Sequence, residues 1–514
     1  MIVMKFGGSS VANAERIRTV AGIVTERLAE QPVLVLSAMG DVTDHLLAAA
    51  ERALHEGPAS VEQSVAFLTK IHEDVIDGLD LGGDETPRLD SGGGVAGVSP
   101  AEGVAEGGSS IELRPERGGD FPLLNVSQAS LIEEIETLLE ELAALIAGIS
   151  LIRELTPKTK DYLVSFGERL AVRIVAAYFD KTGVRAVPLD AWDAGITSTG
   201  DFTAAEPADE CGEHIPQAIL PLVEAGIVPV VTGFIAKCYA DTDDRANPTA
   251  GDITTLGRGG SDLTATLIAA SCRAKEAQVW KDVDGVLTAD PRIVEGARPV
   301  EAITYDEAAE LAYFGAQVLH PRAMLPCMKT GVPVLVKNSY NPAAKGTRIS
   351  GGPVKTSQPV RALTTKKNVT LVDIVSTRML GQSGFLAEVF ALFAAHKISV
   401  DVIATSEVSI SLTIDGDGER GLAEARKSLQ RIADVEVKTG KAIVTIIGDV
   451  SRSSEILARA FTVCAYLGVT VEMVSQGASK VNVSFIVNGD DAPSVVRALH
   501  KGFFEGGYAL RANG

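Results

Sequence analysis

The sequence predicts an α/β protein, an αβα sandwich followed by two ferredoxin-like βαββαβ modules. In the first half, short β-branched runs at 32–37, 227–232 and 277–280 alternate with helical patterns. Near-continuous apolar strands separated by helices are typical of a parallel sheet that is covered on both faces. After residue 360, one pattern of strands and helices occurs twice.

The length of the chain requires more than one domain. At 514 residues it exceeds the roughly 250–300 residues that one hydrophobic core supports. Residues 82–122 are rich in glycine and poor in aromatic residues, and 351–361 are rich in glycine and proline. We expect a first domain at 1–350, a linker at 351–361 and two modules at 362–440 and 441–514. Within the first domain, 82–122 is interpreted as a flexible insertion, with a functional lid as the alternative.

One long helix is expected at about 131–149. Ser130 precedes it and Glu133 follows three residues later, which is the pattern of a capping box. The sequence therefore predicts that Ser130 is the N-cap.

The repeat in the second half is visible in two pairs of segments. Residues 398–403 match 469–474, and at the same offset 410–414 match 481–485. Each copy reads strand, helix, two strands, helix, strand, which is the βαββαβ unit. The sequence leaves open how strands are shared between the two copies.

The composition excludes several classes of protein. With 46% hydrophobic and 22% charged residues the chain is globular, and it has no run of the roughly 18 apolar residues that a membrane span needs. The net charge of −20 argues against nucleic acid or an anionic membrane as a partner. The N-terminus lacks the features of a secretory signal, so a cytoplasmic location is expected.

The cysteines predict no disulfide framework and no metal site. Their number is odd, and they include no Cys-x-x-Cys pair. They are expected to be reduced and mostly buried thiols, at positions Cys211, Cys238, Cys272, Cys327 and Cys464.

Two glycine-rich motifs indicate phosphoryl transfer. Residues 5–10 read Lys-Phe-Gly-Gly-Ser-Ser, and 257–262 read Gly-Arg-Gly-Gly-Ser-Asp. Glycine lets backbone N–H groups approach phosphate oxygens closely, and Lys5 and Arg258 supply positive charge where negative charge accumulates. The alternative for Lys5 is an ordinary surface lysine.

On these motifs and four others the chain resembles the aspartate kinases (aspartokinases) of the amino-acid kinase family. The matching segments, in order, are 5–11, 163–168, 233–235, 255–262, 280–286 and 314–321. The resemblance implies a carbamate kinase-like sandwich followed by two ACT domains.

The resemblance also implies roles for the site residues. Lys5 would neutralise charge in the transition state, and Asp262 would orient Lys5. Arg258 would bind the α-carboxylate of L-aspartate, and Glu168 would accept from its ammonium group. The implied aspartate-binding residues are Ser37, Thr43, Glu168, Phe234, Arg258 and Ser261. The structural alternatives are a helix N-cap for Asp262 and a core side chain for Phe234.

ATP is the implied nucleotide, and Mg²⁺ would be carried by it. The implied ATP-binding residues are Lys5, Phe6, Gly7, Gly8, Gly259, Gly260, Lys281, Asp282, Leu287, Arg292, Gln317 and Val318. Two of these depart from many relatives, which carry a lysine where Gln317 stands and a tyrosine where Leu287 stands.

The repeated module resembles the ACT domain, which binds small amino acids and implies feedback control by L-lysine. In the lysine-sensitive members a strand-to-helix turn holds the carboxylate of lysine, and Asp401 and Glu407 would attract its amino groups. The implied effector residues are Met379, Gln382, Gly384, Phe385, Leu386, Ser399, Val400, Asp401, Thr405 and Glu407. Alternatively, the modules only dimerise and Asp401 is a solvated charge at a strand edge.

The activity implied by the resemblance is phosphorylation of L-aspartate by ATP, giving ADP and 4-phospho-L-aspartate. This step opens the synthesis of lysine, threonine and methionine. A homodimer or a dimer of dimers through the ACT domains is expected. The alternatives are another amino-acid kinase, such as a glutamate or carbamate kinase, and a non-catalytic amino-acid sensor that retains the fold.

Overall fold

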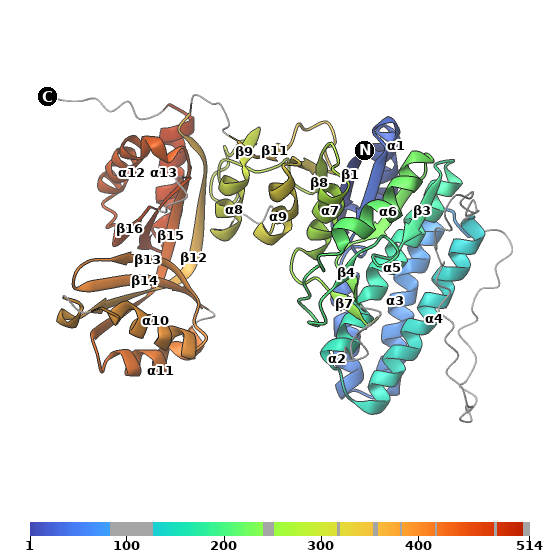
Figure 1. Ribbon diagram of the computed structural model, residues 1–514, viewed down its shortest axis with the longest axis horizontal. Coiled ribbons are helices and arrows are strands. Elements are labelled where there is room, and N and C mark those ends of the chain that lie inside the picture. The colour runs from blue at the N-terminus through green and yellow to red at the C-terminus, as the bar shows by residue number, and fades with distance from the viewer. Residues whose placement is uncertain are drawn as a thin grey trace. The chain divides into compact units, whose positions relative to one another are not determined.

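The computed structural model of the chain describes residues 1–82, 127–239, 251–315, 319–352, 358–380, 383–416, 419–476 and 481–506. The chain forms two compact units, Met1–Asp282 and Val283–Gly514 (Figure 1). The predicted insertion at 82–122 lies, apart from Gly82, outside the described residues.

The first unit is built on a parallel sheet whose strands follow the order β3-β5-β2-β1-β8. These strands are β1 (Ile2–Phe6), β2 (Pro32–Leu36), β3 (Ala186–Leu189), β5 (Val228–Thr232) and β8 (Ala277–Lys281). A small second sheet contains β4 (Thr197–Ser198), β6 (Ile235–Cys238) and β7 (Ile253–Thr255). The three strands predicted from their apolar runs, now β2, β5 and β8, are confirmed.

Helices cover this sheet. Every residue of β1, β2 and β5 is buried, as expected for strands enclosed on both faces. The helices are α1 (Ala14–Thr25), α2 (Val42–His55), α3 (Pro58–Gly78), α4 (Gln128–Ile152), α5 (Pro157–Lys181), α6 (Cys211–Glu224) and α7 (Gly260–Ser271). Figure 1 shows α3, α4 and α5 as long helices lying side by side.

The predicted N-cap of α4 is wrong by three residues. The helix begins at Gln128, and the cap is Ser127, whose Oγ accepts from Ser130 N–H at 3.2 Å. The Ser130 hydroxyl oxygen in turn accepts from Ser127 N–H at 3.2 Å. A serine can therefore take the N3 position of the capping box, a role that the sequence pattern assigned to Glu133.

The second unit begins with three short strands and two helices. They are β9 (Ala302–Thr304), α8 (Tyr305–Tyr313), α9 (Pro321–Thr330), β10 (Val334–Asn338) and β11 (Thr347–Ser350). A six-stranded sheet follows, in the order β13-β14-β12-β15-β17-β16. The strand of this sheet that comes first in the sequence begins at Val360, and the bounds of the predicted linker, 351–361, stay predictions.

Up to α13, the elements of this second part alternate as the repeat predicts; the final strand predicted for the second copy is not found among the described residues. They are β12 (Val360–Val375), η3 (Thr377–Met379), α10 (Phe385–Ala395), β13 (Val400–Thr405), β14 (Ser409–Asp415), α11 (Glu419–Leu429), β15 (Asp434–Gly448), α12 (Ser453–Leu467), β16 (Met473–Ser475), β17 (Asn482–Asn488) and α13 (Ala492–Phe504). The ferredoxin-like fold class is confirmed, and the domain bounds at 350 and 440 stay predictions.

The two copies share their two longest strands. The second half of β12 pairs with β14 and with the first half of β15, which completes the first copy. The first half of β12 pairs with the second half of β15, which pairs with β17 of the second copy. The last strand position of the second copy is therefore filled by 360–367, which precede the first copy in the sequence.

In both shared strands, the alternation of side chains between the two faces of the sheet shifts by one residue where one copy gives way to the other. In β12, Leu363 faces the core under α12 and α13, whereas Val372 faces the core under α10 and α11. One position is odd and the other even, so in a regular strand the two side chains would point to opposite faces. An irregularity in the register lies between them at Asn368, whose φ is 59°. Because side chains alternate along a strand, one extra residue exchanges the faces of all later side chains, and Leu363 and Val372 can then both point toward the helices.

The other face of the same sheet has its own small core. Phe314, at the end of α8, packs there against alternate residues of the sheet such as Leu371, Ile443 and Ile486. The sheet therefore carries helices α10–α13 on one face and the end of α8 on the other.

The cysteines and the apolar helices of the structure relate to two expectations drawn from composition. All five cysteines are free thiols and four of them are buried, as predicted. Among the described residues, no helix is both long enough and apolar enough to cross a bilayer.

The shared strand generates a stability prediction. Leu363→Ala should destabilise the second copy by about 2–5 kcal/mol, because it removes a buried side chain from the core under α12 and α13. Hydrogen exchange should quicken in β17 and α13. Leu412→Ala in β14 is the matched control and should loosen α10 and α11 instead. If Leu363→Ala loosened α10 and α11, the strand sharing would be wrong.

Candidate active site

Adjacent parallel strands of the first unit end at one edge of the sheet and deliver polar side chains there. Lys5 lies near the end of β1, Ser37 follows β2, and Lys281 ends β8. The order β2-β1-β8 makes these three strands neighbours. The carboxyl edge of a parallel sheet is where α/β proteins bind their ligands.

A buried ion pair joins this edge to helix α7. Lys5 Nζ lies 2.8 Å from Asp262 Oδ1, and both side chains are less than a tenth exposed. Lys281 Nζ lies 3.4 Å from the other oxygen, Asp262 Oδ2. Burial alone would raise the pKa of the Asp262 carboxyl, but the charges of Lys5 and Lys281 outweigh it and lower that pKa. Asp262 is therefore held as a carboxylate between two ammonium groups.

The glycine-rich loop brings α7 close enough for this pair to form. Gly259 is the N-cap of α7 and has φ of 76°, in the left-handed region that glycine tolerates. A Cβ on Gly260 would lie 2.8 Å from the ring of Phe234, and one on Gly233 would lie 2.6 Å from Ser261 Cβ. The structural alternative, that Asp262 is the N-cap of α7, is wrong, because Asp262 lies within the first turn of the helix.

The 233–235 turn packs directly on the first turn of α7. Phe234 has φ of 68°, which is uncommon for a residue other than glycine. Its N–H donates to Thr264 Oγ1 at 3.2 Å, and its carbonyl oxygen accepts from Leu256 N–H at 2.8 Å. These bonds hold the aromatic ring at the wall of a pocket, so Phe234 is not an ordinary core side chain.

Glu168 is a buried carboxyl with one free oxygen. Its Oε1 accepts from Ala38 N–H at 3.1 Å, while Oε2 has no hydrogen-bond partner among the described residues. Burial raises the pKa of Glu168 to about 8, although the Ala38 bond and the charge of Lys5 act in the opposite direction. Without a ligand, Glu168 is therefore largely protonated at neutral pH.

These groups surround one pocket of about 500 Å³. The predicted residues that line it are Lys5, Ser37, Thr43, Glu168, Phe234, Arg258, Gly259, Gly260, Ser261 and Asp262. Arg258 is exposed at the pocket, and no ion pair engages it in the part of the chain that the structure describes. The exposed cations Arg258 and Lys160 and one unsatisfied carboxyl thus face the same cavity as the Lys5–Asp262 pair.

The remaining predicted nucleotide residues lie outside this pocket. Phe6 is fully buried and stacks on Trp280 with ring centroids 5.7 Å apart, so its side chain belongs to the core. Gly8 packs on backbone, because a Cβ there would lie 2.7 Å from Gly40 O. Gly7 follows β1, and Asp282 is exposed after β8.

Four further nucleotide residues belong to the second unit or are not described. Leu287 is half-buried, and the Arg292 side chain is 87% exposed and paired with Asp290 at 2.7 Å. Gln317 and Val318 lie outside the described residues. Their contacts with ATP stay predictions.

The predicted effector residues of the second unit lie on η3, α10 and β13. Met379 ends η3, Gly384 is the N-cap of α10 with φ of 94°, and Phe385 is buried in the first turn. Leu386 is 42% exposed. Val400, Asp401 and Thr405 belong to β13, with Ser399 before it and Glu407 after it, whereas Gln382 lies outside the described residues.

Asp401 is not the solvated charge that the alternative interpretation expected. Its side chain is 4% exposed, and Oδ2 lies 2.9 Å from Lys366 Nζ. Oδ1 accepts from the Tyr313 hydroxyl at 2.7 Å. β13 is indeed an edge strand, but its one carboxylate points inward onto these two partners.

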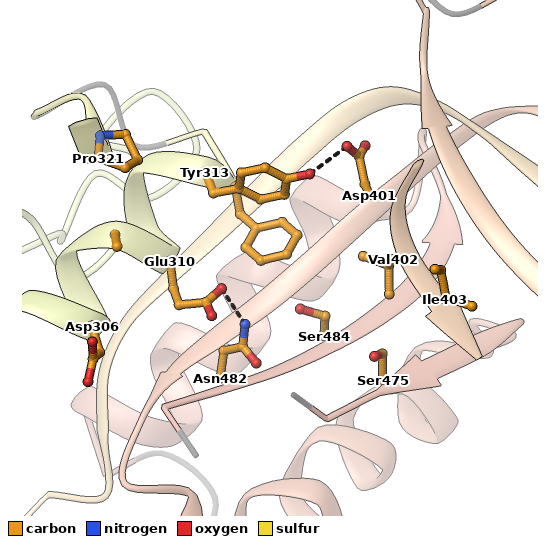
Figure 2. Close-up of a pocket in the computed structure, with 12 residues that line it drawn as sticks. Asp306, Glu310, Tyr313, Pro321, Asp401, Val402, Ile403, Ser475, Asn482 and Ser484 are labelled. Carbon is orange, nitrogen blue, oxygen red and sulfur yellow. Dashed lines mark hydrogen bonds between the residues drawn. The ribbon is translucent and has the colours of Figure 1, made fainter. Parts of the chain in front are cut away.

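Figure 2 shows the pocket of about 490 Å³ around this contact. Tyr313 of α8 points toward Asp401 of β13, and Glu310 accepts from Asn482 Nδ2 of β17 at 2.6 Å. Helix α8 is therefore bonded to a strand of each copy.

The described residues include no group of three or more histidine, cysteine and acidic side chains arranged to hold a metal ion.

Comparisons with known proteins place the chain in a family. The model of the amino acid kinase family matches residues 1–338, and the ACT domain model matches 372–430 and 444–503. The chain is 45% identical to aspartokinase 1, chloroplastic, of Arabidopsis thaliana, over 98% of this chain and 80% of that protein. The chain belongs to the aspartokinases of the amino acid kinase family. The resemblance inferred from the motifs is confirmed.

A bacterial relative supports the same assignment in sequence and in structure. Lysine-sensitive aspartokinase 3 of Escherichia coli is 37% identical over 79% of this chain and 89% of its own. The crystal structure of E. coli aspartokinase III in complex with aspartate and ADP (R-state) matches with a TM-score of 0.72 and 32% identity, covering 98% of this chain and 100% of that one. The structure of the same enzyme in complex with lysine and aspartate (T-state) matches with a TM-score of 0.71 over 98% of this chain.

Several residues that line the active-site pocket of this aspartokinase-family chain were not predicted from the sequence. They are Leu47, Lys160, Asp161, Val164, Thr203, Thr255 and Gly257. Asp161 could have been found, because it lies seven residues before Glu168, which is two turns along one helix face. The others carry no recognisable signal, since their place depends on loops that meet only in the fold.

The high pKa of Glu168 generates a prediction about stability and pH. In the folded protein Glu168 keeps its proton up to about pH 8, whereas in the unfolded chain it loses the proton near the ordinary glutamate pKa of 4.5. Between these values the folded state binds more protons, so Glu168 lowers the free energy of unfolding as the pH rises. Glu168→Gln does not titrate and should stabilise the ligand-free protein by about 1–3 kcal/mol at pH 8.5, and by less at pH 5.5.

Calorimetric melting temperatures at the two pH values measure this difference. Glu224→Gln, at an exposed position on α6, is the matched control and should change neither value. A gain in melting temperature for Glu168→Gln that is equal at pH 5.5 and 8.5 would contradict the assigned titration.

Proposed function

We propose that the chain catalyses the phosphorylation of the side-chain carboxylate of L-aspartate by ATP, giving ADP and 4-phospho-L-aspartate. The observation that carries the proposal is the pocket in which exposed Arg258 and buried, half-satisfied Glu168 accompany the Lys5–Asp262 pair. The aspartokinase relatives and the E. coli complex with aspartate and ADP support the same substrates.

The pocket suits a free α-amino acid. The Arg258 guanidinium offers paired donors for the α-carboxylate. The unsatisfied Glu168 Oε2 offers an acceptor for the ammonium group, and that contact would favour the ionised form of Glu168. Hydroxyls of Ser37, Thr43 and Ser261 would complete the polar wall, and Phe234 the apolar one.

With both α-groups bound in this way, the side-chain carboxylate remains for reaction. One of its oxygens attacks the γ-phosphorus of ATP, and the bond from that phosphorus to the leaving oxygen of ADP breaks. No general base is needed, because a carboxylate with an ordinary pKa of about 4 is ionised at neutral pH. Catalysis then consists of alignment and of charge neutralisation.

Lys5 is the group best suited to neutralise this charge. Its ammonium is fixed by Asp262, so it needs little reorganisation as charge develops. Backbone N–H groups at Gly7–Gly8 and at Gly259–Gly260, together with Lys281, would bind phosphate oxygens. Leu287, Arg292, Gln317 and Val318 complete the proposed nucleotide contacts.

Mg²⁺ would enter with the nucleotide and reduce the charge on its phosphate oxygens. The carboxylates of the pocket suit this, because Asp262 is engaged by Lys5 and Lys281 and Asp161 accepts three hydrogen bonds. Phosphate oxygens and water would then supply most ligands of the ion, as Mg²⁺ prefers.

We further propose that L-lysine inhibits the enzyme through the ACT domains. The carboxylate of lysine would bind the turn at Met379–Leu386, and its amino groups would bind Asp401 and Glu407. The structure of the E. coli enzyme with lysine and aspartate supports this class of effector. The product would feed lysine, threonine and methionine synthesis, and the ACT domains would join subunits into a homodimer or a dimer of dimers.

A hydroxamate assay on the purified protein tests the catalytic proposal. Product should form with ATP, Mg²⁺ and aspartate, and at least roughly a hundredfold more slowly with glutamate, whose longer side chain misplaces the attacking oxygen. Addition of lysine should lower the rate with aspartate. Faster turnover of glutamate would favour another amino-acid kinase, and no turnover of either would favour a non-catalytic sensor.

The partners of Asp401 generate a prediction about inhibition. An amine that binds Asp401 must compete with the Tyr313 hydroxyl and with Lys366, whose Nζ also lies 5.1 Å from the Tyr313 ring centroid. Tyr313→Phe keeps the ring and removes one competitor, so the lysine concentration for half-inhibition should fall by about two- to tenfold. Asp401→Ala should abolish the inhibition.

The uninhibited rate should stay the same in both variants. Tyr466→Phe, an exposed tyrosine on α12, is the matched control and should leave lysine sensitivity unchanged. Unchanged or weaker inhibition in Tyr313→Phe would show that lysine does not compete for this carboxylate.

A further inference from the structure

Asp161 is a buried carboxylate of the active-site pocket to which the proposed reaction assigns no role. It lies in the first turns of α5, and 1% of its surface is exposed. It lines the same pocket as Glu168 and Arg258. No cation forms an ion pair with it among the described residues. Burial raises the pKa of Asp161, and its hydrogen bonds and the charge of Lys160 offset that rise only in part.

Three hydrogen bonds converge on this one carboxylate. Oδ2 accepts from the backbone N–H groups of Thr203 at 2.7 Å and Thr255 at 2.9 Å. Oδ1 accepts from the Thr255 hydroxyl at 2.9 Å. Asp161 therefore joins α5 to the end of β7 and to the turn at 201–204, three segments that are far apart in sequence.

The Thr203 turn is a strained support. Thr203 has φ of 71°, in a region that a β-branched residue rarely adopts. Such a conformation persists only where its surroundings hold it. The bond from Thr203 N–H to Asp161 is one such restraint, and the bond from Ala205 N–H to Thr255 O at 2.9 Å is another.

Both segments that Asp161 holds adjoin the loop that carries Arg258. Thr255 lies three residues before Arg258, at the end of β7. A Cβ on Gly257 would lie 3.3 Å from Thr203 O and 3.4 Å from Ala204 Cα, so the turn packs against the residue that precedes Arg258. The backbone that leads into Arg258 is thus supported at two points, Thr255 and Gly257, by segments that Asp161 holds.

We propose that Asp161 is a positioning residue that sets the Arg258 loop for the α-carboxylate of the substrate. This inference rests on the proposed function. A guanidinium binds a carboxylate through two donors in a fixed plane, so a small tilt of its backbone loses affinity. The hydrogen bonds of Asp161 go to Thr203 and Thr255, and among the described residues none goes to Lys5, so its effect should be specific to the amino acid.

Asp161→Asn tests the proposal. The amide keeps the size of the carboxylate but turns one acceptor into a donor, which faces N–H or O–H donors in this site. The KM for aspartate should rise by about tenfold or more, while the KM for ATP stays within about twofold and kcat within about threefold. Thr255→Val, which removes only the hydroxyl bond, should raise the KM for aspartate by a smaller factor and remains informative if Asp161→Asn folds poorly.

Two comparisons separate positioning from general stability. Asp190→Asn is the matched control, because Asp190 is a buried carboxylate paired with Arg173 outside the pocket. It should lower the melting temperature and leave both KM values unchanged. In an Arg258→Ala background, Asp161→Asn should add no further rise in the KM for aspartate, because Asp161 acts through Arg258.

The results that overturn the inference are distinct from failure of the proposed function. Equal rises in the KM for ATP and for aspartate, a fall in kcat alone, or a full additional effect in the Arg258→Ala background would each refute positioning by Asp161. A wild-type protein that forms no acyl phosphate from aspartate would instead refute the proposed function.

Discussion

The ion pair between Lys5 and Asp262 is the contact on which the active site depends. It joins the end of the first strand to the first turn of α7 at 2.8 Å, with both side chains almost completely buried. A buried charge that loses its partner costs roughly 3–5 kcal/mol, so the two residues hold each other in place. Gly233 and Gly260 let the 233–235 turn and the first turn of α7 pack closely, and Gly259 supplies the left-handed conformation at which the helix begins.

Two carboxyl groups of one pocket are held in opposite states by their surroundings. Asp262 lies between Lys5 and Lys281 and is ionised, whereas Glu168 is buried with one hydrogen bond and keeps its proton. In the proposed reaction, Asp262 would orient Lys5 for phosphoryl transfer, and Glu168 would bind the ammonium group of the substrate. Such divergence of pKa between neighbouring acids is typical of catalytic sites.

Much of the fold and of this site could be predicted from sequence. The apolar strands at 32–37 and 277–280 carry their own signal, and residues that follow neighbouring parallel strands must meet at one edge, which brought Lys5, Ser37 and Lys281 together. What could not be predicted depends on contacts between distant segments. The spacing of Asp161 to Glu168 places both on one face of α5, but the partners of Asp161, Thr203 and Thr255, are identified only by the fold.

The same reason accounts for the second unit. The repeat predicted two βαββαβ copies, but not that 360–367 supply a strand to the later one. The sequence of a β-branched run does not indicate which strand it pairs with. Asp401 was expected to face solvent or an effector, and its contacts with Tyr313 and Lys366 arise from segments that precede the module or start it. Local patterns thus predicted the elements, and long-range pairing determined how they are shared.

A double-mutant cycle on kcat tests the central claim most directly, with Lys5→Met, Asp262→Asn and the combined variant assayed with saturating ATP and aspartate. If the two residues act as one unit, each single change costs several orders of magnitude and the double variant is within about threefold of the slower single. A double variant whose loss equals the product of the two single losses would contradict the account, because the residues would then act independently.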